Sequence, residues 1–268
     1  MSDNKDTSVV PVAAPVRAPV AAKPVSRGWL EDIGYFDTAS EQKMRVLAYG
    51  DMKVGKTTLL ATFPNVVMID TDKGGATLRK QHIPFVPCYD SKGIIKRVFS
   101  ILEAARARSG PFAPGGEFAA CETIALDSMS VFSNSALVDL IYQTGRDAME
   151  VKAGYDEYGR LLNVQVALGK LFKALSTQYN VVVTALSTVD KDESTGSMVG
   201  GPLVVGSYRG LIGADFDEIY YLSSEGTKDA VKHVMFTSKS SFYNAGTRLG
   251  GMPYKIESPT YAKIKAFV

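Results

Sequence analysis

The chain has 268 residues, of which 46% are hydrophobic and 22% charged, a balance typical of a soluble globular protein with one large domain or two small ones. It holds no uncharged apolar run of about 18 residues, and its first residues are polar, so we expect neither a membrane-spanning helix nor a secretory signal. The only cysteines, Cys88 and Cys121, form no CxxC pair, which favours a reducing, cytoplasmic location.

The formal net charge is +2, and residues 1–27 account for all of it. The rest of the chain holds 26 of the 30 basic and 26 of the 28 acidic side chains, which cancel. Bulk charge therefore gives no argument for nucleic-acid binding, and such a surface would have to be a local patch.

The start of the chain has the composition of a tether. Residues 9–25 read VVPVAAPVRAPVAAKPV, and their four prolines oppose both helices and sheet ladders. We predict that residues 1–27 form a disordered Ala/Pro/Val-rich tail, which is either inert or a docking arm for a partner. We place the folded domain at residues 28–268.

Apolar strand-like runs then alternate with helical patterns. We expect helices at residues 56–63, 91–108, 130–144 and 161–179, where apolar side chains recur every three or four positions. We expect strands at residues 44–49, 65–70, 84–89, 122–127, 180–186, 216–222 and 232–238, the last of them antiparallel, and a final edge strand at 261–268. The glycine- and proline-rich residues 109–116 are predicted to be a loop.

This alternation of strands and helices predicts an α/β fold. Its sheet is expected to be mostly parallel, with helices on both faces. Ligands of such sheets bind at the carboxyl ends of the strands.

Residues 50–58 carry the strongest motif. They read GDMKVGKTT, follow an apolar strand, open a helix, and fit the phosphate-binding P-loop pattern GxxxxGK[ST] without a gap. Glycines let such a loop turn tightly, so that its N–H groups surround phosphate oxygens beside the positive end of the following helix. We assign nucleotide binding to Gly50, Asp51, Met52, Lys53, Val54, Gly55, Lys56, Thr57 and Thr58.

Within this loop, two side chains have distinct expected roles. Lys56 would neutralise the β- and γ-phosphates, and the hydroxyl of Thr57 would be offered to Mg²⁺. Lys53 either touches a phosphate or a neighbouring subunit, or is an ordinary exposed loop lysine. ATP and Mg²⁺ are therefore the predicted ligands.

Two further strands end in acids. Asp127 closes the run TIALD, about 70 residues after the P-loop, and we assign it to Mg²⁺ beside Thr57. The run VVMIDTD ends in Asp70 and Asp72. Asp72 could polarise the attacking water as a general base, whereas Asp70 is nearer the strand and could be structural. A strand-end turn without catalytic function is the alternative for both.

Three later segments are candidates for contacts with ligands. Residues 187–214 form a long glycine-rich segment with Lys191, Arg209 and Tyr208, which suits a loop contacting single-stranded DNA or a solvated flap. Residues 154–160, GYDEYGR, carry Tyr155, Tyr158 and Arg160, which could stack on bases or simply pack before the next helix. Arg248, in a polar loop, could reach a γ-phosphate in its own or a neighbouring subunit, or be a surface residue.

Several of these motifs together resemble the phage RecA-like nucleotide-binding proteins. The resemblance rests on GDMKVGKTTLLATFPNVVMIDTDKGG, with its lysine inside the P-loop, its TFPN link and its strand ending in I-D-T-acid, and on ETIALDSMS. The runs NVVVTAL and FDEIYYL resemble later strands of that group, so the likeness covers residues 43–257. Members act in phage recombination, and some are described as ATP-dependent single-strand annealing proteins.

The resemblance implies a RecA-like core with ATP held by Lys56 and Thr57 and with Mg²⁺ at Asp127. It implies that Asp72 stands where such proteins carry a catalytic glutamate, and that Leu186 stands near their polar sensor position. It places Arg248 near a basic residue of the group. It also implies single-stranded DNA as a partner, assembly into homo-oligomers, and the host cytoplasm as the location.

The prediction is therefore an ATPase, with Lys56, Asp72, Asp127 and Arg248 as candidate catalytic residues, acting on single-stranded DNA in phage recombination or replication. A second reading is a nucleotide-dependent assembly switch that scarcely hydrolyses ATP, favoured by the short side chain of Asp72. A third is a small-molecule kinase, which needs an arginine-rich lid, whereas residues 187–214 hold only Arg209.

Overall fold

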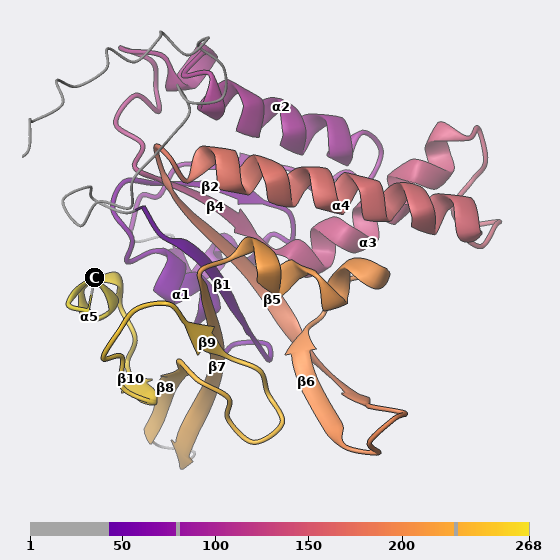
Figure 1. Cartoon of the computed structure of the whole chain (residues 1–268). Coiled ribbons are helices and arrows are strands. Elements are labelled where there is room, and N and C mark those ends of the chain that lie inside the picture. The colour runs from indigo at the N-terminus through magenta and orange to yellow at the C-terminus, as the bar shows by residue number, and fades with distance from the viewer. Residues whose placement is uncertain (1–42, 79–80, 228–229, 268) are drawn as a thin grey trace, which may run out of the picture. The chain divides into compact units, whose positions relative to one another are not determined.

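Short apolar runs form the buried centre of the sheet in the computed structural model, which describes residues 43–267 apart from 79–80 and 228–229 (Figure 1). The buried runs are β1 (Arg45–Gly50), β2 (Val66–Asp70), β4 (Thr123–Asp127) and the first half of β5 (Asn180–Lys191). Strands buried on both faces need cover on both faces, as in parallel sheets generally. The predicted tail at 1–27 and the predicted domain start at residue 28 lie outside the described residues.

The remaining strands extend this centre on both sides. They are β3 (Phe85–Pro87), β7 (Glu218–Thr227), β8 (Ala230–Phe236) and β10 (Lys255–Glu257). The strand order is β10-β8-β7-β1-β5-β4-β2-β3, with parallel pairing from β7 to β3 and antiparallel pairing of β8 with both of its neighbours. β5 therefore lies between β1, which leads into the P-loop, and β4, which ends in Asp127.

Helices cover both faces. α2 (Ile94–Arg106), α3 (Met129–Gln143) and α4 (Tyr155–Leu175) pack on one face, and the short α1 (Lys56–Leu60) and α5 (Tyr261–Lys265) pack on the other (Figure 1). Alternation along β1 serves both layers, because Leu47 and Tyr49 join the first core whereas Val46 and Ala48 join the second. The predicted class, a mostly parallel sheet with helices on both faces, is confirmed. None of the helices in the described ranges has the length and apolar character required to cross a bilayer.

Two predicted elements are wrong. The described part of residues 261–268 does not form the expected edge strand, because the Thr260 side chain accepts a hydrogen bond from the backbone N–H of Lys263 and starts α5. Residues 187–214 are not one long loop, because β5 continues to Lys191 and pairs antiparallel with β6 (Met198–Pro202). Two short 3-10 helices, Ser207–Gly210 and Ile212–Asp215, fill much of the rest.

Several boundaries also differ from expectation. α1 ends at Leu60 rather than at residue 63, and α4 begins at Tyr155 rather than at 161. The early start of α4 follows from its cap, where the Glu157 carboxylate accepts a hydrogen bond from the backbone N–H of Gly154 at 2.7 Å. Further short elements escaped the sequence patterns: β9 (Gly246–Thr247), β10, and 3-10 helices at Gly74–Leu78 and Gly110–Phe112.

The end of β1 illustrates how closely the P-loop is packed against the sheet. A Cβ atom at Gly50 would lie 2.1 Å from the backbone oxygen of Leu222 on β7. Because that oxygen belongs to the backbone of a buried neighbouring strand, it cannot turn aside as a side chain could. Only glycine fits where β1 passes into the P-loop.

We predict that Gly50→Ala lowers the free energy of unfolding by about 1–3 kcal/mol, since a backbone shift is needed to admit the methyl group. Gly159→Ala is the matched control. Gly159 lies in α4, and a Cβ atom there would meet nothing within 4 Å. That control should be neutral or stabilising by up to about 1 kcal/mol. Urea denaturation of the two variants measures both values, and equal stability of the Gly50 variant and wild type would contradict the packing argument.

Candidate functional site

The P-loop opens onto a cavity of about 560 Å³ at the carboxyl ends of the central strands. Residues from the predicted binding loop line one side of it: Met52, Lys53, Gly55, Lys56, Thr57 and Thr58. The other walls come from four different segments and comprise Asp72, Gly74, Asp127, Ser128, Leu186 and His233. The structure therefore brings together residues more than 170 positions apart in the sequence around the motif.

Three residues assigned to nucleotide binding do not line this cavity. Gly50 ends β1, and Val54 is buried in the core between β1 and α1. The Asp51 carboxylate accepts a hydrogen bond from the Ser187 hydroxyl, which lies at the base of the β5–β6 hairpin. These three residues therefore belong to the packing of the loop and not to the cavity wall, and Asp51 connects the loop to the hairpin by a hydrogen bond.

Lys56 is held by the loop's own carbonyl groups. Its Nζ donates hydrogen bonds to the backbone oxygens of Gly50 at 3.0 Å and Asp51 at 2.6 Å. Burial lowers the pKa of Lys56, while the nearby carboxylates, Asp127 foremost, oppose that shift. A half-buried ammonium group beside the P-loop backbone is suited to bind phosphate oxygens.

Asp127 is the most enclosed acid of the cavity, with 2% of its surface exposed. Its Oδ2 accepts a hydrogen bond from the Thr57 hydroxyl at 2.8 Å, and its Oδ1 accepts one from the Thr184 hydroxyl. Burial raises the pKa of Asp127, and the two hydroxyl donors partly offset this rise. The oxygens of Thr57 and Asp127 form a hard donor pair, which fits Mg²⁺.

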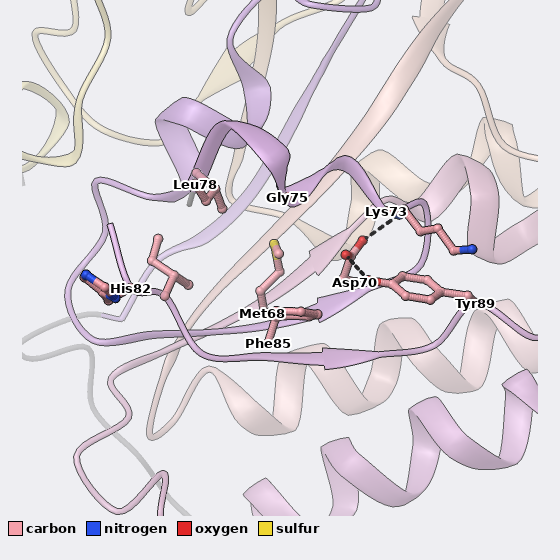
Figure 2. A pocket seen from close by; sticks show the side chains of 9 residues that line it. Met68, Asp70, Lys73, Gly75, Leu78, His82, Phe85 and Tyr89 are labelled. Carbon is pink, nitrogen blue, oxygen red and sulfur yellow. Dashed lines mark hydrogen bonds between the residues drawn. The ribbon is translucent and has the colours of Figure 1, made fainter. Parts of the chain in front are cut away.

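Asp70 and Asp72 point to different places although they are two residues apart. Asp70 lies in a second cavity of about 350 Å³, where its carboxylate accepts hydrogen bonds from the Tyr89 hydroxyl at 2.6 Å and from the backbone N–H of Lys73 at 3.0 Å (Figure 2). Asp72 lines the P-loop cavity, and its Oδ1 accepts a hydrogen bond from the backbone N–H of Gly74 at 2.7 Å. Asp70 therefore holds the turn after β2, and Asp72 is the acid presented to the P-loop.

The electrostatics of Asp72 suit proton transfer. Burial raises its pKa, and the negative charge of Asp127 raises it further, while its hydrogen bond from Gly74 acts in the opposite direction. A carboxylate with a raised pKa is a better proton acceptor than an ordinary one.

Sequence reasoning missed two residues of the site. Thr184 is a polar side chain inside the buried strand NVVVTAL, a signal that could have found it. His233 gave no signal, because β8 reaches the P-loop only through antiparallel pairing with β7. The expected sensor position, Leu186, lines the cavity with an apolar side chain.

Arg248 lies at the amino ends of β1 and β7, opposite the end of β1 that leads into the P-loop. Its guanidinium contacts the Asp217 carboxylate at 2.7 Å, and Arg45 at the start of β1 shares that partner at the same distance. Five residue steps of about 3.3 Å separate Arg45 from Gly50, roughly 16 Å in all. The expectation that Arg248 reaches a phosphate in its own subunit is therefore wrong.

The candidate DNA-contacting residues separate into buried and exposed groups. Tyr208 is buried and donates a hydrogen bond to the Asp215 carboxylate, so its ring cannot stack on a base, and Arg209 is paired with Asp190 at 2.7 Å. In contrast, Tyr155 is 98% exposed and Tyr158 43% exposed on the first turns of α4. The accessible aromatic surface thus lies at the start of α4, not in the glycine-rich segment.

We predict that Asp127→Asn stabilises the ligand-free protein at neutral pH by about 0.5–2 kcal/mol, the range of ordinary stabilising substitutions. The pKa of Asp127 is raised on folding, so wild type loses stability as the pH rises through that pKa. The gain in the variant should therefore shrink as the pH falls. Urea denaturation at pH 8 and pH 5 measures it, and a wild type more stable than the variant at pH 8 would refute the argument.

A comparison with known proteins places this chain in a family. A family model described as an AAA domain matches residues 42–249, whereas no curated protein sequence matches the chain significantly. Among similar solved structures, the flagellar accessory protein FlaH from Methanocaldococcus jannaschii is 13% identical over 81% of this chain and 85% of that chain, with a TM-score of 0.43. A KaiC-like protein from Pyrococcus horikoshii OT3 is 13% identical over 73% of this chain and 78% of that chain, with a TM-score of 0.41. The RadB recombinase is 16% identical over 81% of this chain and 86% of that chain, with a TM-score of 0.43. Since the model match spans most of the chain, this protein belongs to the AAA domain family.

Proposed function

We propose that this protein binds ATP with Mg²⁺ and hydrolyses it, and that it acts on single-stranded DNA in recombination or replication, as phage RecA-like proteins do. The proposal rests on the convergence of four residues on one cavity: Lys56 and Thr57 from the start of α1, Asp72 from the turn after β2, and Asp127 from the end of β4. Phosphate-binding, metal-binding and proton-accepting groups are thus adjacent, which is the set that phosphoryl transfer requires.

Each of these residues has a role that follows from its surroundings. Lys56 would exchange its two carbonyl partners for phosphate oxygens, and the oxygens of Thr57 and Asp127 would hold Mg²⁺. A bound Mg²⁺ supplies neutralisation of the charge on the phosphate groups. Asp72 would accept the proton of the attacking water.

The DNA partner is supported by exposed aromatic side chains on a helix that also carries an arginine. Tyr155 and Tyr158 stand on the surface at the start of α4, and Arg160 follows in the same helix. Bases of single strands stack on such rings irrespective of sequence. The β5–β6 hairpin provides a second surface, and the Ser187–Asp51 hydrogen bond connects it to the P-loop.

Assembly into a homo-oligomer belongs to the same proposal. Arg248 is exposed at the amino ends of β1 and β7, remote from its own P-loop, and it pairs with Asp217. Its candidate role is accordingly limited to a phosphate bound by a neighbouring copy. That role would require Arg248 to leave Asp217.

The two alternatives differ from this proposal in the chemistry at the cavity. A switch that binds ATP with little hydrolysis would use the same phosphate and Mg²⁺ ligands, and the short side chain of Asp72 favours it. A small-molecule kinase is disfavoured, because the cationic side chains among the described cavity residues are lysines and none is an arginine.

Turnover of ATP by the purified protein, with and without single-stranded DNA, tests the proposal. We expect DNA to stimulate turnover and Lys56→Ala to reduce it at least about 100-fold, the loss typical of removing one charge-stabilising donor. Lys96→Ala is the control, since Lys96 is exposed on α2 away from the cavity. Turnover retained in the Lys56 variant would refute the ATPase. Lys56-dependent turnover that ignores DNA would remove only the partner, and tight ATP binding without turnover would select the switch.

Asp72→Asn tests the proton acceptor. We expect kcat to fall about 100- to 10,000-fold while the Kd for ATP changes little, because the amide cannot accept a proton. Asp70→Asn is the matched variant two residues away, and it should mainly lower the free energy of unfolding, since Asp70 holds the turn after β2. Equal kcat values for the Asp72 variant and wild type would exclude Asp72 as the base.

A further inference from the structure

His233 lies against the P-loop although it is remote from it in the sequence. A Cβ atom placed on Gly55 would lie 3.0 Å from both Cγ and Cδ2 of the imidazole, so the ring packs directly on the loop backbone. His233 is half-buried and lines the same cavity as Lys56 and Thr57. Any ligand cradled by the loop passes close to this ring.

The strand order gives the cavity two unlike ends. Asp127 and Asp72 follow β4 and β2, which lie on one side of β1, and they mark the end where Mg²⁺ and the terminal phosphates belong. His233 comes from β8, two strands away from β1 on the other side. The β8 side of the cavity, where His233 lies, is therefore the end available to the nucleoside of a nucleotide whose terminal phosphates lie beside the acids.

One ring nitrogen of His233, Nδ1, lies within hydrogen-bonding distance of a partner among the described residues, and the other, Nε2, does not. Its Nδ1 lies 3.1 Å from the Ser224 hydroxyl on β7, which fixes the orientation of the ring. The described residues supply no hydrogen-bond partner for Nε2. Since Ser224 can donate to or accept from Nδ1, Nε2 can correspondingly donate to or accept from a ligand.

We infer that His233 contacts the nucleoside end of the bound nucleotide, its ribose or base, with a hydrogen bond at Nε2. This inference rests on the proposed binding of ATP and extends it, because it assigns a residue that recognises more than phosphate. P-loop residues read phosphates, so a nucleoside contact on β8 is what distinguishes ATP from inorganic polyphosphate at this site.

The test compares the binding of ATP and of inorganic tripolyphosphate, both with Mg²⁺, by isothermal titration. We expect His233→Ala to weaken ATP about threefold to tenfold, the value of one hydrogen bond, and to leave tripolyphosphate unchanged. His233→Gln, which keeps a hydrogen-bonding group of similar reach, should recover most of the ATP affinity. His82→Ala is the control, because His82 lines the second cavity. Thermal unfolding of each variant confirms that it is folded.

Each alternative result is decisive. Wild-type affinity for ATP in the His233→Ala variant would overturn the inference and leave the proposed ATP binding intact. Equal weakening of ATP and tripolyphosphate would show a phosphate contact and also overturn it. If wild type bound neither ligand, the proposed function itself would fail and the inference with it.

Discussion

The carboxylate of Asp127 accepts hydrogen bonds from two hydroxyl groups, those of Thr57 and Thr184. The arrangement of the site depends on this pair of hydrogen bonds. Thr57 belongs to the helix that follows β1, and Thr184 belongs to β5, the strand inserted between β1 and β4. An apolar residue in place of Thr184 would leave a buried carboxylate oxygen without its partner, at a cost of about 1–3 kcal/mol. β5 thus sets the spacing between Asp127 and the P-loop, and its Thr184 hydroxyl donates a hydrogen bond to the second carboxylate oxygen of Asp127.

The strand order also explains why the two ends of the cavity differ. The acids come from β2 and β4 on one side of the P-loop, and the imidazole of His233 comes from β8 on the other. β5 continues beyond the sheet into the hairpin with β6, and Ser187 at its base contacts Asp51. This hydrogen bond is a direct contact between the P-loop and the hairpin.

The sequence predicts what is local and fails where distant segments meet. The P-loop and Asp127 could be found because each motif is contiguous with its own apolar strand. The place of His233 depends on strand order, which no local pattern encodes, whereas Thr184 could have been noticed as a polar residue inside an apolar strand. The distance of Arg248 from its own P-loop follows from the pairing of β9 with the amino end of β7, which no local pattern encodes. Residues 261–268 are too short to show a period, and the Thr260 cap was the better signal.

We propose that Thr57 and Asp127 hold Mg²⁺ for a nucleotide bound by the P-loop. Isothermal titration of ATP with and without Mg²⁺, on wild type and Thr57→Val, tests this metal site. We expect Mg²⁺ to tighten ATP binding to wild type and to have no such effect on the variant, which lacks the hydroxyl. Mg²⁺ enhancement of equal size in both proteins, or no ATP binding by wild type, would contradict it.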